Sequence, residues 1–533
     1  MDIKHIAKPT AEQREKNKNY RIAISYPPMP DDKGTPCLGQ NRQFQWFNNP
    51  TFIYPMVPSY AASLLKDQGY DVMWDDGIAE GLEPEEWLKR LKKFKPNLIA
   101  METKTPVVKR HWKLIEVLKE ELPKTKIVLF GDHVTALPEE SMENSQVDVV
   151  ATGGDYDFLL LNVANSINHQ EKLEPGVWYR KNLKPQTSNL KPITKNLLNS
   201  KQESEIKNTG HFLLNHDLDE LPFIDRDLTK WKLYAYKNGN YKVTPGTYTY
   251  AARDCWWGRC TFCSWTTLYP GEDYRKHSVK RMLDEVGVLI HEYRVKEIMD
   301  DSGSFPVGPW LAEFCQGMIE RGYNKKVIFD CNMRLKALSQ EEYNLMGKAG
   351  FRFILYGLES ASQKTLDKIN KNLKVEEIEK GVKMAKSGGL EPHITTMMGY
   401  PWETRVDAEK TVKLAKKLFD KGYVDTLQAT IVIPYPGTPL YKECKEKDWL
   451  TTTNWDEFDQ RMAVMKSPLT EKDIKELTQE LYKSFMTPKF IMRKIFSVRK
   501  WSDVAFLFRA GSKVLGHLLD FSPKNKEKEC KNC

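Results

Sequence analysis

The sequence lacks the features that would place it outside the cytoplasm. No apolar run reaches the roughly 18 residues that a membrane-spanning helix needs. The N-terminal stretch MDIKHIAKPTAEQREKNKNY is polar and lacks the apolar core of a secretion signal. The nine cysteines are odd in number and irregular in spacing, which argues against a disulfide framework. We therefore expect a cytoplasmic protein in a reducing compartment.

A strong imbalance of charge is also missing. The net charge of +9 comes from 81 basic and 72 acidic residues in 533 positions, so nucleic acid is not an expected partner. Hydrophobic residues make up 40% and charged residues 29%, the usual proportions of a soluble globular protein. The length corresponds to about three or four domains.

The first third of the chain alternates between apolar strands and amphipathic helices. Strand-like stretches such as RIAISY and KIVLFGD are separated by helical ones such as HWKLIEVLKEEL. This alternation is typical of a parallel sheet with helices on both faces, so we expect a Rossmann-like domain over residues 18–170. Residues 171–240 are polar without a sustained period, and we interpret them as a linker that is partly ordered near LDELPFIDRDL.

The alternation resumes near residue 246. Strands are predicted at 247–253, 296–299, 327–331, 352–358, 391–398 and 426–433. A helix is expected to begin after Ser278, a good N-cap, with Met282, Val286 and Leu289 on one face. The fold class is therefore α/β, with a partial (β/α)6 TIM-like barrel over residues 241–445 and a helical, basic region over 446–533. Functional residues are expected at the carboxyl ends of the barrel strands.

Three cysteines follow the first barrel strand, in the stretch YTYAARDCWWGRCTFCSW. Cys255, Cys260 and Cys263 lie within nine positions, where a barrel would place its functional site. A structural zinc site usually takes four ligands, and three thiolates are one short. A cubane 4Fe-4S cluster held by three thiolates instead leaves one iron open to an outside ligand.

This loop resembles the cluster loop of radical S-adenosylmethionine (SAM) enzymes. Further stretches are similar to motifs of that superfamily and occur in its order: IMDDSGSF, NMRLKAL, YGLESAS, TTMMGYPWET and IPYPGTPLY. The likeness covers roughly residues 20–445. The domain order is similar to the branch that carries an N-terminal cobalamin-binding-type domain.

The resemblance implies a 4Fe-4S cluster and SAM as cofactors. In that family the open iron chelates SAM, one-electron reduction cleaves it, and a 5′-deoxyadenosyl radical abstracts hydrogen from an unactivated C–H bond. Carried over by motif, the three loop cysteines are the cluster ligands. The residues implied to contact SAM are Phe262, Asp300, Asp301, Ser302, Arg334, Glu359 and Ser360. Arg334 and Glu359 are also the implied catalytic residues, with Arg334 paired to the SAM carboxylate.

The sequence departs from the family pattern in two places. In the cysteine loop, four residues separate the first two cysteines where three are usual, and Asp254 replaces a common glycine. In the N-terminal domain, the Asp-x-His-x-x-Gly motif whose histidine ligates cobalt is missing, and His133 follows a late strand. Cobalamin is therefore an open alternative rather than a fixed cofactor.

Structural alternatives accompany the implied site residues. The cysteines could bind zinc with a distant fourth ligand, and the Asp-Asp-Ser-Gly stretch could be a solvated turn. Arg334 and Glu359 could form an ion pair across strand ends. Trp256 and Trp257 either pack against the N-terminal domain or line the cavity. His393, on a predicted strand, is interpreted as a core histidine.

The remaining cysteines have simpler interpretations. Cys315, Cys331 and Cys444 are predicted to be buried thiols. The stretch CKNC at 530–533 has metal-ligand spacing but lies in a charged tail, so an auxiliary metal role there is the minor alternative.

A basic and apolar stretch at 489–521 carries seven Lys and Arg against two Asp. It fits a helical cap on the barrel, or a surface helix on an anionic membrane in which cations meet headgroups and apolar side chains enter the acyl boundary. The second interpretation would add peripheral contact with the inner membrane face and would favour a lipid substrate.

The sequence thus predicts a radical SAM enzyme that functionalises an unactivated carbon of an apolar small molecule or lipid, with a reductant such as flavodoxin or ferredoxin as partner. Cobalamin-dependent methyl transfer and cobalamin-free rearrangement or coupling both fit. One competing hypothesis is an RNA-modifying radical SAM enzyme, but such enzymes usually carry a second three-cysteine cluster in the N-terminal domain, where only Cys37 lies. The other is a zinc-stabilised scaffold that docks on membranes without catalysis.

Overall fold

The chain divides into two compact units. The structure is a computed structural model that describes residues 3–39, 44–181, 205–271, 274–484 and 487–498, together with residues 504 and 511. Unit 1 comprises Met1–Pro28 and Val57–Lys230, and unit 2 comprises Met29–Met56 and Trp231–Cys533.

Unit 1 is built on a single sheet with the strand order β4-β1-β5-β6-β7-β8-β9. Its strands are β1 (Arg21–Tyr26), β4 (Asp71–Asp76), β5 (Leu98–Glu102), β6 (Lys126–Phe130), β7 (Val149–Ala151), β8 (Val177–Arg180) and β9 (Ile206–Asn208). The first five are parallel, and every residue of β5 is buried, as expected for a strand that is covered on both faces. Chain order reverses at β1, so β1 and β5 diverge at a topological switch point, where doubly wound sheets bind ligands.

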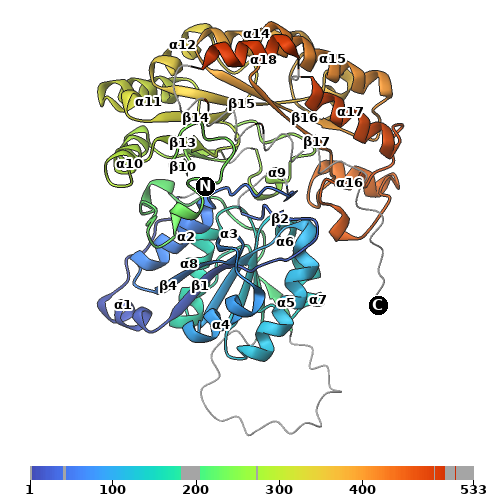
Figure 1. The fold of residues 1–533 in the computed structure, drawn as a ribbon. Helices are drawn as coiled ribbons and strands as arrows, with labels where there is room; N and C mark the ends of the chain where they lie inside the picture. The colour runs from blue at the N-terminus through green and yellow to red at the C-terminus, as the bar shows by residue number, and fades with distance from the viewer. Residues whose placement is uncertain are drawn as a thin grey trace. The chain divides into compact units, whose positions relative to one another are not determined.

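Helices lie on both faces of this sheet (Figure 1). They are α1 (Ala11–Lys18), α2 (Met56–Asp67), α3 (Gly77–Glu80), α4 (Pro84–Phe94), α5 (Val108–Glu121), α6 (Asp132–Ala136), α7 (Pro138–Asn144) and α8 (Tyr156–His169). The predicted Rossmann-like arrangement is confirmed. Within residues 171–240, which the sequence suggested as a linker, the structure places β8 and β9, and these extend the sheet as antiparallel strands beyond β7.

Unit 2 contains a second, fully parallel sheet with the order β10-β13-β14-β15-β16-β17. Its strands are β10 (Gly246–Thr249), β13 (Glu297–Asp300), β14 (Ile328–Met333), β15 (Phe351–Glu359), β16 (Glu391–Met398) and β17 (Thr426–Ile431). All six predicted strands are present. Because the strand order follows the chain order, each carboxyl end contributes one loop to the same edge, as in a partial barrel.

The helices of unit 2 alternate with these strands and then continue beyond the sheet. They are α9 (Trp265–Leu268), α10 (Val279–His291), α11 (Pro309–Glu320), α12 (Gln340–Lys348), α13 (Gln363–Lys368), α14 (Val375–Ser387), α15 (Arg405–Lys421), α16 (Pro439–Glu446), α17 (Glu471–Lys483) and α18 (Pro488–Ser497). The Ser278 hydroxyl caps α10 as predicted, and Met282, Val286 and Leu289 are buried on its inner face. Two short ribbons, β2 (Thr35–Pro36) with β3 (Trp46–Phe47) and β11 (Ala252–Arg253) with β12 (Arg275–Lys276), complete the unit. Within the described ranges, no helix is both long and apolar enough to cross a bilayer.

Residues 29–56 pack with unit 2, although they follow the first strand of unit 1. The Nζ of Lys33 lies 2.7 Å from the Asp459 carboxylate, and the Gln45 side chain donates to that of Gln460 at 2.9 Å. The predicted domain of residues 18–170 therefore includes a segment that the structure groups with the second unit.

A buried guanidinium ties four strands of unit 2 together at the amino end of the sheet. The Nη2 of Arg352 lies 2.6 Å from Glu297 and 2.9 Å from Asp330, and its Nη1 lies 2.9 Å from Glu391. Burial would lower the pKa of Arg352, but the surrounding carboxylates outweigh burial and raise it. Burial likewise acts to raise the pKa of Glu391, whereas Arg352 and Lys242 hold that pKa at about 2.

We expect Arg352→Met to destabilise the protein by about 3–5 kcal/mol, because it leaves buried carboxylates without their counterion. The measurement is a urea titration that follows fluorescence at neutral pH. Arg405→Met is the matched control, since Arg405 makes its ion pairs with Glu409 and Asp473 on the surface and should change the midpoint little. Equal midpoints for the two variants would contradict a structural role for the buried cluster.

Candidate functional site

The three cysteines of the loop between β11 and α9 open into one cavity of unit 2. Cys255, Cys260 and Cys263 are half-buried, and all three line this cavity of about 260 Å³. The loop turns tightly at Gly258, whose φ is +52° and whose Cβ, if present, would lie 2.3 Å from the Cα of Gly271. Only glycines permit so close a crossing of two backbone segments, which lets the loop with its longer cysteine spacing fold back on itself.

The thiol of Cys255 is held in its neutral form. Burial raises the pKa of Cys255, and the charge of Asp254 raises it further, while the backbone amides of Gly258 and Trp257 act in the opposite direction. Thiols must lose their protons before they bind a metal. Loading this site with a metal is therefore expected to release protons.

Asp254, which the sequence showed only as a departure from the family pattern, fastens the cysteine loop to the loop after β13. Its Oδ1 accepts hydrogen bonds from the Tyr250 hydroxyl at 3.0 Å and from the Gly303 amide at 2.7 Å. A Cβ on Gly303 would lie 2.3 Å from the other carboxylate oxygen of Asp254. Glycine at 303 is thus needed for this contact.

The three residues Asp300, Asp301 and Ser302 at the end of β13 have two different roles. Asp301 lines the cavity, whereas Asp300 and Ser302 do not. The Asp300 carboxylate accepts from the backbone amide of Ala251 at 2.7 Å, and the Ser302 hydroxyl accepts from that of Ala252 at 2.9 Å. Asp300 and Ser302 therefore hold the backbone that leads into the cysteine loop, and only Asp301 faces the space where a ligand would lie.

Glu359 and Lys371 form a buried ion pair in the cavity wall. The Nζ of Lys371 lies 2.7 Å from Oε1 of Glu359, and both residues line the cavity. Burial acts to lower the pKa of Lys371, but the negative charges of Glu359 and Cys260 outweigh it and raise the pKa. Ser360, the neighbour of Glu359, lies behind the wall, where its hydroxyl accepts from the Ser362 amide at 3.1 Å.

Local backbone geometry presents this pair to the cavity. Glu359 ends β15 with a φ of 63°, and Lys371 stands between Asn370 and Asn372, whose φ values are 53° and 50°. Asparagine tolerates this left-handed conformation better than most residues. Gly357 leaves the space that the pair fills, because a Cβ there would lie 2.1 Å from Glu359 Oε1 and 2.5 Å from Lys371 Nζ. Sequence reasoning missed Lys371, and the Asn-Lys-Asn pattern was the signal that could have indicated it.

Arg334 lies against the cysteine loop instead of pairing with Glu359. Its guanidinium carbon lies 4.8 Å from the ring centre of Trp257 and 5.5 Å from that of Trp256. Its Nη1 lies 3.9 Å from Sγ of Cys260, and its Nη2 donates to the backbone carbonyl of Lys371. The predicted alternative of an Arg334–Glu359 ion pair is wrong in this structure, because Glu359 pairs with Lys371.

The rest of the cavity wall is largely apolar, with a few amide side chains. The apolar residues that line it are Ile53, Tyr248, Phe262, Met299, Met333, Leu355, Met397, Val432, Ile433 and Tyr435. The amides are those of Asn240, Asn332, Gln428 and Gln460. Such a lining suits a ligand with a large apolar surface that is oriented by a small number of polar contacts.

The arrangement of the thiols differs from that of a single-ion site. Among the described residues, three potential metal ligands lie within 4.8 Å of one another only in unit 1, where they are His5, Asp217 and Glu220. The three cysteine sulfurs do not meet this distance. In a cubane cluster each cysteine binds a different iron, so its thiolates are spread more widely than around one zinc ion.

The remaining predictions on cysteine and histidine are largely confirmed. Cys315, Cys331 and Cys444 are buried free thiols. His393 is buried, its Nδ1 lies 2.8 Å from the Thr426 hydroxyl, and burial lowers its pKa to about 3, as expected for a neutral core histidine. The CKNC stretch at 530–533 lies outside the described residues.

Comparisons with known proteins agree with this site. Residues 251–415 match the family model of the radical SAM superfamily. The chain is 28% identical to an uncharacterized methyltransferase of Pyrococcus horikoshii, over 83% of this chain and 90% of that protein. It is 24% identical to the anaerobic magnesium-protoporphyrin IX monomethyl ester cyclase of Rubrivivax gelatinosus, over 83% of this chain and 74% of that one.

A solved structure shares the fold of the described chain. The cobalamin-dependent S-adenosylmethionine radical enzyme OxsB, with aqua-cobalamin and S-adenosylmethionine bound, matches with a TM-score of 0.65 at 13% identity. The match covers 94% of this chain and 72% of OxsB. The similarity supports the predicted order of an N-terminal parallel-sheet domain followed by a partial barrel.

The position of Arg334 generates a prediction about an iron–sulfur cluster bound to these cysteines. A positive charge beside Cys260 stabilises the extra negative charge of a reduced cluster. Arg334→Met should therefore shift the midpoint potential of the reconstituted cluster to a more negative value, measured by electron paramagnetic resonance during a redox titration. Lys368→Met is the control, because the Lys368 ammonium lies over the Trp402 ring at 4.5 Å and not beside a cysteine. An unchanged potential in Arg334→Met would contradict the assigned contact.

Proposed function

We propose that this chain, which matches the radical SAM family model over residues 251–415, is a cobalamin-dependent methyltransferase that acts on an unactivated carbon of an apolar substrate. One observation carries the proposal. Three thiols from a single loop and the Glu359–Lys371 ion pair converge on one largely apolar cavity. The similarity to the Pyrococcus methyltransferase supports methyl transfer as the reaction class.

The residues of the cavity fit the cofactors of the superfamily. Cys255, Cys260 and Cys263 would hold a 4Fe-4S cluster, which together with SAM supplies a carbon-centred radical able to remove a hydrogen atom from the substrate. The Glu359 carboxylate and the Lys371 ammonium match in charge the amino and carboxylate groups of a methionine moiety. Lys371 takes over the carboxylate contact proposed for Arg334, whose guanidinium instead positions the cysteine loop. Phe262 offers a flat apolar face to an adenine ring.

In unit 1, the polar groups at the carboxyl ends of β1 and β5, where the sheet has its topological switch point, are a candidate site for cobalamin. The Tyr26 hydroxyl at the end of β1 donates to Glu102 at the end of β5 at 2.7 Å. The Lys104 ammonium lies 3.8 Å from Glu102 and 3.4 Å from Asp132. These buried groups, at the carboxyl ends of parallel strands, suit a ligand that carries many amide side chains.

Cobalt would not be ligated by the histidine that follows β6. The Nδ1 of His133 lies 3.1 Å from the Thr105 hydroxyl, and its Nε2 lies 3.1 Å from the Glu140 carboxylate. Both ring nitrogens are thus engaged within unit 1. With no Asp-x-His-x-x-Gly motif in the sequence, the proposal is a cobalamin that has no histidine ligand from these positions.

The cavity wall supports an apolar substrate. Met299, Met333 and Met397 stand on the strands β13, β14 and β16 of the same sheet and line the cavity. Methionine side chains are flexible and polarisable, so they adapt to irregular apolar shapes. The reductant that such chemistry requires is expected to be a small electron-transfer protein such as flavodoxin or ferredoxin.

Bound cobalamin separates methyl transfer from rearrangement or coupling. We expect anaerobically reconstituted protein, offered hydroxocobalamin and then desalted, to retain about four irons and one cobalamin per chain, measured by chemical analysis and absorbance. Cys260→Ala should lose iron and keep cobalamin, because Cys260 belongs to unit 2 and the groups proposed for cobalamin belong to unit 1. Four irons without cobalamin would overturn methyl transfer and favour coupling, whereas stoichiometric zinc without iron would support a non-catalytic scaffold.

Lys371→Met should weaken SAM binding by about 10- to 100-fold, since it removes a charge-assisted hydrogen bond in a buried site. The measurement is equilibrium dialysis with SAM on the iron-loaded protein, which needs no turnover. Lys368→Met, three residues earlier and over the Trp402 ring, is the matched control and should bind as the wild type does. Unchanged SAM affinity in Lys371→Met would exclude Lys371 from the methionine site.

A further inference from the structure

Helix α18 carries apolar side chains on the side that faces away from the protein. Eleven large apolar side chains of the described chain are exposed, and four of them lie on this ten-residue helix. They are Ile491 at 49% exposure, Met492 at 55%, Ile495 at 61% and Phe496 at 82%. Positions 491, 492, 495 and 496 fall on one face of a helix with 3.6 residues per turn, so the four side chains form a single stripe.

The opposite face of α18 is held to α15 by an arginine. Arg493 donates to the backbone carbonyls of Asp420, at 2.9 Å, and Phe419. These carbonyls lie in the last turn of α15, where helical carbonyls have no partner within the helix. Gly422, the left-handed cap of α15, makes room for this contact, because a Cβ there would lie 2.5 Å from Nη1 of Arg493.

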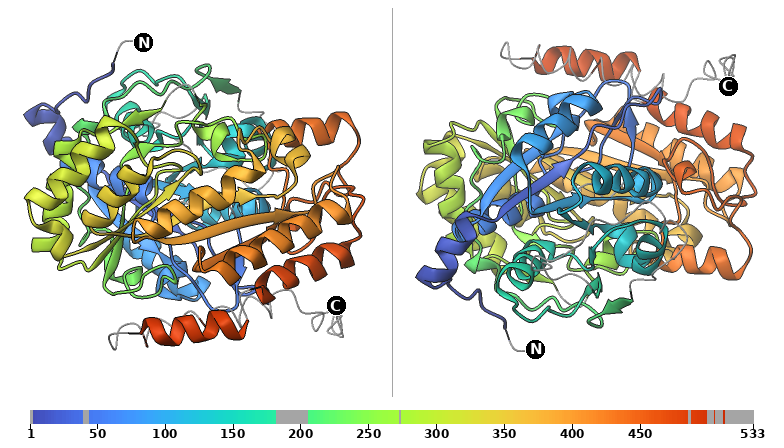
Figure 2. Two further views of the ribbon diagram at one scale, coloured as in Figure 1. Left: turned by 90° about the horizontal axis from the view of Figure 1, so that it is seen from above. Right: turned by 90° about the horizontal axis from the view of Figure 1, so that it is seen from below.

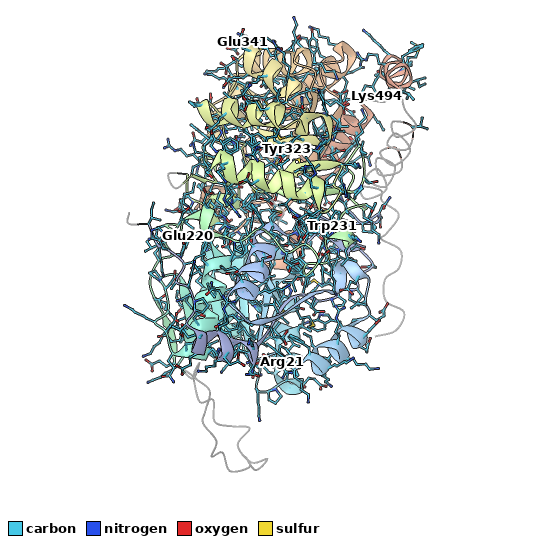
Figure 3. All side chains as sticks on the ribbon, turned by 90° about the vertical axis from the view of Figure 1, so that its left-hand side faces the viewer. Arg21, Glu220, Trp231, Tyr323, Glu341 and Lys494 are labelled. Atoms are coloured by element: carbon cyan, nitrogen blue, oxygen red, sulfur yellow. The ribbon has the colours of Figure 1, made fainter. Side chains whose placement is uncertain are left out.

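Two further contacts keep the same face inward. The Lys494 ammonium lies 2.8 Å from the Asp425 carboxylate, and the Phe490 ring packs edge-on against Phe419 with 5.4 Å between centres. Figure 2 shows α18 at the outer edge of unit 2, and Figure 3 labels Lys494 on it. Since the charged residues of the helix anchor it, the apolar stripe cannot turn inward without breaking these contacts.

We propose that this apolar face of α18 docks on an anionic lipid surface. Lys489 is exposed at the edge of the stripe, and α18 contains no acidic residue. The stretch 489–521 carries seven Lys and Arg against two Asp. Arg493 and Lys494 of this stretch make the inward contacts described above, and Lys489 is exposed. A helix with exposed apolar residues, in a sequence segment with an excess of cations, lies in the headgroup region with its apolar side chains in the acyl boundary. A second copy of the chain fits less well, because a symmetric contact would bring two cationic segments together.

Vesicle co-sedimentation of the full-length, iron-loaded protein tests the proposal. We expect binding to vesicles of phosphatidylglycerol and phosphatidylcholine, weaker binding to phosphatidylcholine alone, and weakening by added salt. The double variant Ile495→Ser/Phe496→Ser should lose at least tenfold in affinity while its cleavage of SAM stays unchanged. Val406→Ser is the matched control, because Val406 is an exposed apolar side chain outside the stripe, 64% exposed at the start of α15, and this variant should bind as the wild type does.

Three results would overturn the proposal. One is the absence of wild-type binding to anionic vesicles. A second is equal binding of the wild type and the double variant. The third is a wild-type dimer in solution that the double variant dissociates and that does not bind vesicles, which would assign the stripe to a second copy. None of these readouts depends on cobalamin, SAM or substrate, so failure here leaves the proposed reaction untouched.

Discussion

The buried guanidinium of Arg352 is the interaction on which the second unit depends. A parallel sheet cannot fix its register through hairpins, because successive strands are joined by long crossovers. Arg352 supplies that register by contacting carboxylates on three other strands, β13, β14 and β16. The cluster sits at the amino end of the sheet and the cavity at the carboxyl end. The charged groups that fix the strands, Arg352 and its carboxylates, therefore lie at the opposite end of the sheet from the charged groups that line the cavity.

The cavity shows the same separation on a smaller scale. In the motif after β13, Asp300 and Ser302 hold backbone amides, and Asp301 faces the open space. In the cysteine loop, Asp254 fastens the backbone, and both Asp254 and its neighbour Cys255 line the cavity. Each short motif thus contains residues that hold the backbone next to a residue that faces the cavity. Arg334 extends this support by lying between two tryptophans, a cysteine sulfur and the carbonyl of Lys371.

The parallel strands of both sheets and the cysteine loop could be predicted from the sequence, because buried parallel strands are continuous apolar runs and the motifs occur in a fixed order. The antiparallel strands β8 and β9 could not, because they lie in a stretch without a sustained period. The supporting roles of Asp254, Asp300 and Ser302 could not be predicted. A side chain that accepts a hydrogen bond from a backbone amide far away in the sequence leaves no local sequence pattern. Lys371 could not be found from hydrophobic periodicity, because the left-handed backbone of Asn370 and Asn372 directs it to the cavity. Residues 29–56 were assigned to the first domain because sequence order says nothing of which unit a long loop joins.

Glu359 and Lys371 neutralise each other's charge in the cavity wall before any ligand arrives. A zwitterion that enters can exchange partners with this pair, so that every charge ends with a counterion. A ligand with only one of the two charges would leave either an ammonium or a carboxylate stranded in a buried place, at a cost of several kcal/mol per ion. If the pair binds a methionine moiety as proposed, the wall would select its ligand mainly by excluding others. It would discriminate against near-analogues that lack one charged group more strongly than it attracts the complete ligand.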